Sequence, residues 1–281
     1  MQTTESLELL RATVRDWRQS GLRVGFVPTM GNLHEGHLAL INDALKHSDR
    51  VVVSIFVNPM QFGPSEDLEN YPRTLAEDQA KLVAAGAHLL FNPRVETVYP
   101  EGEEACSAVL VPESLTDILC GASRPGHFRG VATVVAKLFN MVQPDCAVFG
   151  EKDLQQLRVI ERLTRDLDFP IRIIGSPTLR EASGLARSSR NAYLTEAEHQ
   201  QAPALFAELE RLAGYLAQDR SQLEPAVKQA VKSLEDKGFQ VDYLEVRDRE
   251  TLGPAADRRL VVLAAAWLGR ARLIDNVPVP A

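Results

Sequence analysis

The chain has 281 residues, of which 45% are hydrophobic and 25% charged, and a formal net charge of −7. This size and composition predict a globular protein with a large core and two domains. The acidic balance argues against a nucleic-acid partner, because nucleic-acid surfaces are generally basic. No apolar run approaches the roughly 20 residues of a transmembrane helix, and the N-terminus lacks the pattern of a signal peptide, so we expect a cytoplasmic protein without membrane contact.

The N-terminal residues predict a helix, a strand and a second helix. Apolar residues recur at helical spacing between residues 7 and 17, and Gly21 stands where a helix C-terminal glycine belongs. The apolar run 22–27 predicts a buried strand, which we expect Pro28 to end. Helical spacing resumes over about 37–47. A glycine-containing turn therefore joins the first strand to the next helix.

This turn has the features of a phosphate-binding site. Gly31 and Gly36 permit close approach of a ligand to the backbone, and the new helix presents unpaired N–H groups and the positive end of its dipole. His34 and His37 fall on one side of the turn, where neutral imidazoles could donate to the same phosphate oxygens. An isolated H-x-x-H is more often a surface or metal pair, but the strand and the glycines favour phosphate.

A buried strand over 50–57 and a loop over 58–73 follow. Gln61 lies in this loop, at the edge where open α/β sheets bind ligands, and its amide can both donate and accept. A helix from Thr74 to about Ala85 and a strand over 87–91 are predicted next. Residues 92–125 are irregular, with a possible strand over 108–111.

A largely buried helix over about 130–142 precedes a second crossing from strand to helix. The strand covers 145–149, and G-E-K-D-L-Q-Q-L opens a helix from about Asp153. Lys152 is a point charge placed for a phosphate, although a lysine next to an aspartate is usually a solvated pair. A strand over 171–175 completes the alternating pattern, which predicts an α/β fold with a doubly wound parallel sheet over residues 1–175.

The remaining residues, 176–281, predict a smaller α+β domain. Two helical segments, about 195–218 and 223–237, precede strands near 239–247, 259–266 and 270–275. In the segment that joins the domains, Ser188, Ser189 and Arg190 offer two hydroxyls and a planar guanidinium, which suit triphosphate oxygens. A loop in this position could close over a nucleotide.

Five strings together resemble the pantoate–β-alanine ligase family, which belongs to the nucleotidyltransferases with an H-x-G-H motif. They are P-T-M-G-N-L-H-E-G-H, F-V-N-P-M-Q-F, R-P-G-H-F-R-G-V, G-E-K-D-L-Q-Q and S-S-R-N, and the likeness extends through L-I-D-N at 273–276. The resemblance implies a Rossmann-like domain and ATP-dependent condensation of pantoate with β-alanine through a pantoyl adenylate. It also implies Mg²⁺ as a cofactor and a homodimer.

The resemblance also implies roles for individual residues. Catalytic roles fall on His34, His37, Lys152, Ser188, Ser189 and Arg190. ATP contacts fall on Met30, Gly31, Asn32, Leu33, His34, Glu35, Gly36, His37, Gly150, Glu151, Lys152, Asp153, Leu179, Arg187, Ser188, Ser189 and Arg190. Contacts to pantoate or β-alanine fall on Asn58, Gln61, Arg124, His127 and Gln156, and Asp78 is implied near magnesium.

The chain departs from the family pattern at two positions. Ser183 stands where the family has Asp, and Arg187 stands where it has an apolar residue. Ser183 can still form a local turn, although more weakly than Asp. The rigidity of this loop and the side-chain contact of Arg187 therefore stay open at the level of sequence.

Two other functions are compatible with parts of the sequence. A nucleotidylyltransferase that keeps the nucleotide on its product would use the same histidine motif. A non-catalytic module that senses a nucleotide or binds RNA would bind ATP or RNA without exchanging pyrophosphate. The acidic composition already argues against RNA.

Overall fold

The computed structural model describes residues 1–63, 68, 71–256 and 259–280; part of the loop predicted over 58–73 lies outside these. Six parallel strands form the main sheet in the order β1-β4-β3-β2-β5-β6. They are β1 (Gln2–Thr4), β2 (Val24–Thr29), β3 (Arg50–Ile55), β4 (Leu89–Phe91), β5 (Cys146–Gly150) and β6 (Arg172–Ser176). The predicted parallel α/β sheet is confirmed, with β1 as an unpredicted edge strand.

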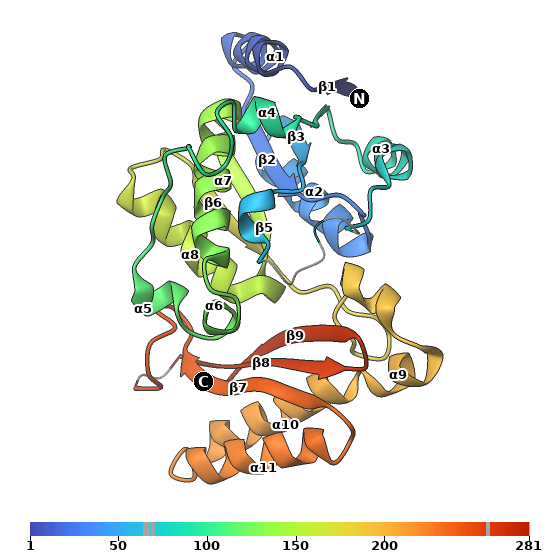
Figure 1. Ribbon diagram of the computed structural model, residues 1–281, viewed down its shortest axis with the longest axis vertical. Coiled ribbons are helices and arrows are strands. Elements are labelled where there is room, and N and C mark those ends of the chain that lie inside the picture. Colours follow the sequence, from blue (N-terminus) through green and yellow to red (C-terminus); the bar gives the residue numbers. More distant parts are fainter. Residues whose placement is uncertain (64–67, 69–70, 257–258, 281) are drawn as a thin grey trace.

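Helices cover both faces of this sheet (Figure 1). One face carries α1 (Leu7–Gln19), α7 (His127–Val142) and α8 (Leu154–Asp166), and the other carries α2 (Glu35–His47) and α3 (Leu75–Ala84). Side chains of β3 alternate accordingly, because successive residues of a strand point to opposite faces: Val52 packs with α1 and α7, whereas Val51 and Val53 pack with α2.

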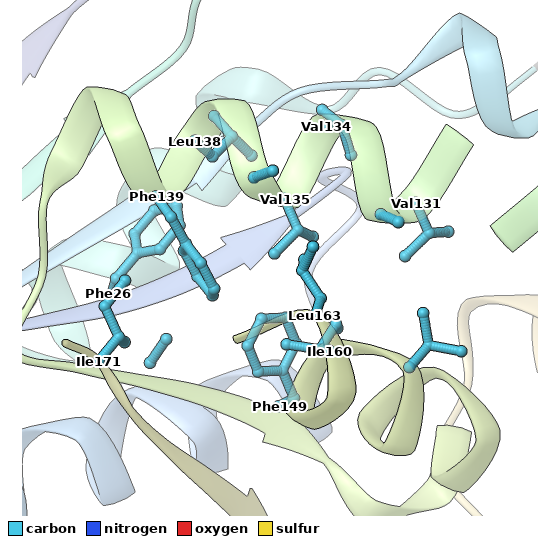
Figure 2. Close-up of a cluster of buried hydrophobic side chains, with 14 of the residues drawn as sticks. Phe26, Val131, Val134, Val135, Leu138, Phe139, Phe149, Ile160, Leu163 and Ile171 are labelled. Carbon is cyan, nitrogen blue, oxygen red and sulfur yellow. The ribbon is translucent and has the colours of Figure 1, made fainter. Parts of the chain in front are cut away.

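The core between α7 and α8 is formed by buried apolar side chains. Thirteen of the 16 residues of α7 are buried, as the sequence predicted. Figure 2 shows Val131, Val135 and Phe139 projecting from α7 toward α8 and the sheet. The Phe139 ring stands edge-on to Phe26 and Phe149, with centroids 6.4 Å apart in each pair. This packing fixes β2 and β5 against each other.

The C-terminal unit is the predicted α+β arrangement. Strands β7 (Gln240–Asp248), β8 (Leu260–Leu268) and β9 (Ala271–Pro278) are antiparallel in that order, with α10 (Ala204–Gln218) and α11 (Leu223–Glu235) on one face. The other face turns toward the first unit (Figure 1), where Val261 and Leu263 join the core cluster that contains α7 and α8. The two units are therefore in direct apolar contact.

Three sequence predictions are wrong in detail. No strand forms over 108–111, because the Val109 N–H donates to Thr133 Oγ1 (3.0 Å) on α7 instead of to another strand. Strand β2 continues past Pro28 to Thr29, since β5 pairs with β2 only at residues 25–26 and leaves the later positions a single neighbour. The helix expected over 195–218 is interrupted before Pro203 and consists of α9 (Glu196–Gln201) and α10.

The irregular region 92–125 contains three short helices, α4 (Val95–Val98), α5 (Glu113–Thr116) and α6 (Cys120–Ser123). Gln155 of α8 holds the loop that connects α5 to α6. Its amide nitrogen donates to the carbonyls of Leu115 (2.9 Å) and Ile118 (2.7 Å), and its oxygen accepts the Cys120 N–H. In the part of the chain that the structure describes, no helix has the length and apolar character to cross a bilayer.

Candidate active site

The first crossing, from β2 to α2, holds its two histidines by reciprocal capping. His34 is the N-cap of α2, and its Nδ1 accepts the Gly36 N–H at 3.1 Å. His37 Nδ1 in turn accepts the His34 N–H at 3.3 Å. Because each Nδ1 is an acceptor, each neutral ring carries its proton on Nε2. The ring centroids lie 4.1 Å apart, so the crossing presents two neighbouring N–H donors.

Both histidines are neutral at physiological pH. Burial lowers the pKa of His34 to about 4, and the charge of Lys152 lowers it further. Burial lowers the pKa of His37 to about 3, with His34 as the second cause. Both imidazoles are therefore neutral, as the sequence led us to expect, and the charge of Lys152 lies near enough to His34 to contribute to this.

The turn before α2 is held by two side chains of α3. Asp78 accepts the backbone N–H groups of Asn32 (2.9 Å) and Leu33 (2.8 Å), and Lys81 Nζ donates to the Leu33 carbonyl at 2.7 Å. Gly31 has φ +86°, and a Cβ there would lie 3.1 Å from Ile55 and 3.2 Å from Asp78. Glycine is required at this position by both conformation and space.

These contacts do not fit a magnesium site centred on Asp78. Its carboxylate is 1% exposed, and it also accepts the Thr74 hydroxyl at 3.2 Å, so both oxygens are already engaged. Within residues 1–63, 68, 71–256 and 259–280, no group of three or more His, Cys, Asp or Glu side chains could hold a metal ion. Asp78 therefore positions the turn before α2, and no step of the reaction is assigned to a metal at this carboxylate.

The second crossing, from β5 to α8, passes through a short 3-10 helix, η2 (Glu151–Asp153). The Lys152 side chain is 15% exposed, with Nζ 3.8 Å from the Asp153 carboxylate. The η2 backbone is held from the C-terminal unit, because Asn276 Nδ2 donates to the carbonyls of Glu151 (2.9 Å) and Lys152 (3.0 Å). Strand β5 lies directly beside β2, so both crossings reach the same edge of the sheet.

The segment between the units crosses the first turn. The Ser189 hydroxyl, at the start of η3 (Ser189–Tyr193), donates to the Asn32 carbonyl at 3.3 Å. Ser188 caps η3 by accepting the Arg190 N–H at 3.3 Å. A small cavity between this segment and β9 is lined in part by Lys152, Ser188 and Asn191. The structure therefore places Ser189 against the turn before α2 and Ser188 in the same cavity lining as Lys152, and the catalytic role of the serines stays a prediction.

The two departures from the family pattern have local explanations. Ser183 still forms a turn, because its hydroxyl accepts the Leu185 N–H at 3.4 Å. The Arg187 guanidinium lies 3.7 Å from Glu35 and 3.5 Å from Glu181, and the Arg187 N–H donates to the Leu179 carbonyl at 2.9 Å. The arginine thus places an ion pair beside α2 where the family has an apolar side chain.

Gln61 ends the short helix η1 (Pro59–Gln61) and is held in one orientation. Asn58 Nδ2 donates to Gln61 Oε1 (3.1 Å), and the Tyr99 hydroxyl donates to Asn58 Oδ1 (2.7 Å). With its oxygen engaged, Gln61 directs Nε2 toward Met30, 3.2 Å from the sulfur. Asn58 is 1% exposed and also donates to the Gly130 carbonyl, so it orients Gln61 rather than facing a ligand.

The R-P-G-H-F-R-G-V string holds the backbone of η1. His127 Nδ1 donates to the Gln61 carbonyl at 2.8 Å, and the Arg124 guanidinium donates to His127 Nε2 at 3.1 Å. A Cβ at Gly130 would lie 2.3 Å from the Met60 carbonyl oxygen, so only glycine lets η1 rest on α7. Arg124 and His127 therefore lie beside Gln61, and their contact with pantoate or β-alanine stays a prediction.

Gln156 is the predicted substrate residue that the structure does not join to these networks. It is half-buried on the first turn of α8 and makes no side-chain hydrogen bond among the described residues. The sequence did not identify Lys81, Tyr99 or Asn276 as parts of the site. Each acts through a contact with a residue more than 40 positions away, which leaves no local pattern.

Two strand-to-helix crossings at adjacent strands, with a histidine pair at one and a lysine at the other, are the arrangement expected of an α/β protein of the nucleotide-binding class. Residues 2–278 match the family model described as Pantoate-beta-alanine ligase. The chain belongs to this family.

Several relatives support the assignment over nearly full length. The chain is 56% identical to the pantothenate synthetase of Colwellia psychrerythraea and 54% identical to that of Pseudomonas aeruginosa, with 99% of each chain covered. The crystal structure of pantothenate synthetase from Thermus thermophilus matches with a TM-score of 0.91 and 46% identity, covering 100% of both chains. A pantoate-beta-alanine ligase from Francisella tularensis, complexed with Beta-gamma ATP and Beta-alanine, has a TM-score of 0.82 and 34% identity, covering 99% of this chain and 97% of that one.

Proposed function

We propose that the residues gathered at the two crossings catalyse the ATP-dependent condensation of pantoate with β-alanine, giving pantothenate, AMP and diphosphate. Family membership supports the reaction, and the Francisella relative, solved with an ATP compound and β-alanine, supports the substrates. Two imidazole N–H donors and Lys152 lie at the ends of neighbouring strands, and this placement supports the assignment of the reaction to these residues.

In the first step, a pantoate carboxylate oxygen attacks the α-phosphorus of ATP in line, and the bond to the diphosphate oxygen breaks. Negative charge builds on the phosphoryl oxygens and on the departing diphosphate. His34 and His37 donate hydrogen bonds from Nε2 to these oxygens, and Lys152, Ser188, Ser189 and Arg190 supply charge and further donors. The product is pantoyl adenylate, and no protein nucleophile takes part.

In the second step, the amine of β-alanine attacks the acyl carbon of the adenylate. The bond from that carbon to the phosphate oxygen breaks, AMP leaves, and the nitrogen loses a proton. The donors of the first step stabilise the charge on AMP. Water must be excluded while the adenylate exists, and we assign this task to residues 176–281, which act as a second domain over the 1–175 domain.

Binding roles follow from the same arrangement. Gln61 donates from Nε2 to an oxygen of pantoate, with Gln156, Arg124 and His127 completing this subsite and Asn58 orienting Gln61. The ATP set is residues 30–37, 150–153, 179 and 187–190. Magnesium is proposed as the companion of the ATP phosphates, without a ligand assigned in this chain. A homodimer and a cytoplasmic location are proposed from family likeness.

ATP–pyrophosphate exchange tests the function. With labelled pyrophosphate, we expect exchange into ATP that requires pantoate and does not require β-alanine. AMP should accumulate only when β-alanine is added as well. A nucleotidylyltransferase would instead retain the nucleotide on its product, and a sensing module would bind ATP without exchange. Either result would contradict the proposal.

A further inference from the structure

The last strand of the C-terminal unit makes two contacts that reach the phosphate-binding region. Asn276 of β9 donates from Nδ2 to the carbonyls of Glu151 and Lys152, at 2.9 and 3.0 Å. Its neighbour Asp275, 5% exposed, makes a two-pronged ion pair with Arg180, at 2.6 and 2.8 Å. Two consecutive residues of β9 therefore hold both η2, which contains Lys152, and the segment between the two units.

The contact between Asn276 and η2 requires a side chain that can donate two hydrogen bonds. The carbonyls of Glu151 and Lys152 belong to η2, the short 3-10 turn that leads directly into α8 at Leu154. An amide nitrogen carries two hydrogens and can serve two acceptors at once. A carboxylate in the same place would bring lone pairs against both carbonyl oxygens. Asparagine is therefore matched to this position by its donors as well as by its size.

The Arg180 contact fixes the strand that carries Asn276. Asp275 also accepts the Asn276 N–H at 2.8 Å, and Arg180 donates to the Gly184 carbonyl at 3.1 Å. The Arg180 guanidinium lies over the Phe206 ring, 3.6 Å from its centroid. These contacts hold Asp275 in place, and they therefore fix the position from which its neighbour Asn276 reaches η2.

We propose that Asn276 is a positioning residue for Lys152, so that the C-terminal unit completes the ATP phosphate site through the backbone of η2. This inference rests on the proposed function, since Lys152 is the group being positioned for ATP. It gives residues 176–281 a second task besides excluding water. Asn276 itself does not touch the nucleotide.

The test measures ATP affinity by direct titration and the Michaelis constants of the reaction. For Asn276→Ala we expect the Kd for ATP to rise about tenfold, from the loss of two hydrogen bonds to the η2 carbonyls. For Asn276→Asp, which keeps the size of the side chain, we expect a larger rise. The KM for pantoate should stay within about twofold of wild type, because Gln61 is held by a separate network. A thermal melt of each variant reports whether it folds.

Ser123→Ala is the matched control. Ser123 of α6 donates to the Asp242 carboxylate of β7 at 2.9 and 3.0 Å, which is also a bond between the units, made to a different strand of the same sheet. The Ser123→Ala substitution should change the Kd for ATP by less than about twofold, because this exposed contact does not involve η2. An equal loss in Ser123→Ala and Asn276→Ala would mean that general docking of the units is responsible, and would overturn the proposal.

A double-mutant cycle with Lys152→Met separates positioning from packing. If Asn276 acts through Lys152, then Asn276→Ala should add almost nothing to the loss of ATP affinity in the Lys152→Met background. A full additive loss, or a wild-type Kd in Asn276→Ala, would overturn the inference while leaving the proposed function intact. A wild-type protein that neither bound ATP nor exchanged pyrophosphate would instead contradict the function, and the inference with it.

Discussion

The two crossings from strand to helix have the same topology but are held in different ways. The turn before α2 is fixed within the first unit, by Asp78 and Lys81 of α3 and by the reciprocal cap between its two histidines. The turn before α8 depends on Asn276, 124 positions away in the C-terminal unit. The comparison teaches that the same supersecondary unit can be self-supporting at one place and incomplete at another.

The crossings also differ in what they offer to a phosphate. The histidines are buried and neutral, so they supply directed N–H donors without charge. Lys152 supplies a charge, which also contributes, after burial, to the lowered pKa of His34. The two histidines are held by contacts within the first crossing, whereas the backbone that carries Lys152 is held by Asn276 of the C-terminal unit.

The largest expected effect is the loss of a histidine donor from the self-supporting crossing. His37→Ala and His34→Ala should each lower the turnover number by about 10² to 10³, roughly 3 to 4 kcal/mol, because each removes a donor to developing phosphate charge. Steady-state rates measure this, with thermal melts as a check on folding. Near-wild-type turnover in either variant would exclude that histidine from catalysis.

The support of the first turn should be visible in stability. Asp78→Asn should lower the free energy of unfolding by about 2 to 3 kcal/mol, since an amide cannot replace the two charge-assisted bonds to backbone N–H groups. Urea unfolding measures the change. Asn276→Ala should cost about 1 kcal/mol or less in the same assay, because the carbonyls it leaves lie at a half-buried edge that water reaches. Equal losses in the free energy of unfolding for the two variants would contradict the proposed difference in how the two crossings are held.

The stability of the folded protein should also depend on pH because of His37, and it should decrease as the pH is lowered. Its pKa is about 3 in the folded protein and about 6.5 when unfolded, so only the unfolded chain gains a proton as pH falls through that window. Between pH 7 and pH 5 we expect a loss of about 1 to 2 kcal/mol in the free energy of unfolding that is missing in His37→Asn. Parallel urea titrations of both proteins measure it. Identical pH slopes would show that the folded His37 is not held neutral.

The smallest effect is expected at Arg187. Arg187→Leu should change the Kd for ATP by less than about twofold, because the proposed ATP contact of residue 187 is made by its backbone, while its side-chain ion pairs with Glu35 and Glu181 are long and the side chain is 39% exposed. Titration with ATP at low and high salt measures the effect. A tenfold loss that disappears at high salt would instead make Arg187 part of the charge acting on the phosphates.

The residues around Gln61 illustrate the limits of reading the sequence alone. F-V-N-P-M-Q-F and its position after a buried strand were enough to predict Gln61 as a ligand residue. The string did not separate Gln61 from Asn58, which the structure buries beneath it as an orienting group. The deciding partner, the Tyr99 hydroxyl, lies 41 positions from Asn58, in an irregular region where the sequence predicted only a possible strand over 108–111.

Asp78 shows the same limit for the predicted metal. Adjacent acids on a helix face are compatible with a magnesium ligand or a solvated surface, and neither description fits a carboxylate that accepts two backbone N–H groups from a turn 45 positions earlier. That role depends on how α3 packs against the first crossing, which is a matter of helix position rather than of residue type.

The sequence by itself determined the alternation of strands and helices, the two turns from strand to helix and the histidine pair, because each follows from the spacing of residues close together in the chain. The tertiary structure decided that β5 lies beside β2, that Asn58 and Asp78 orient other groups, and that the C-terminal sheet supports Lys152. These depend on contacts between residues far apart in sequence, and a single sequence carries no periodic trace of such contacts.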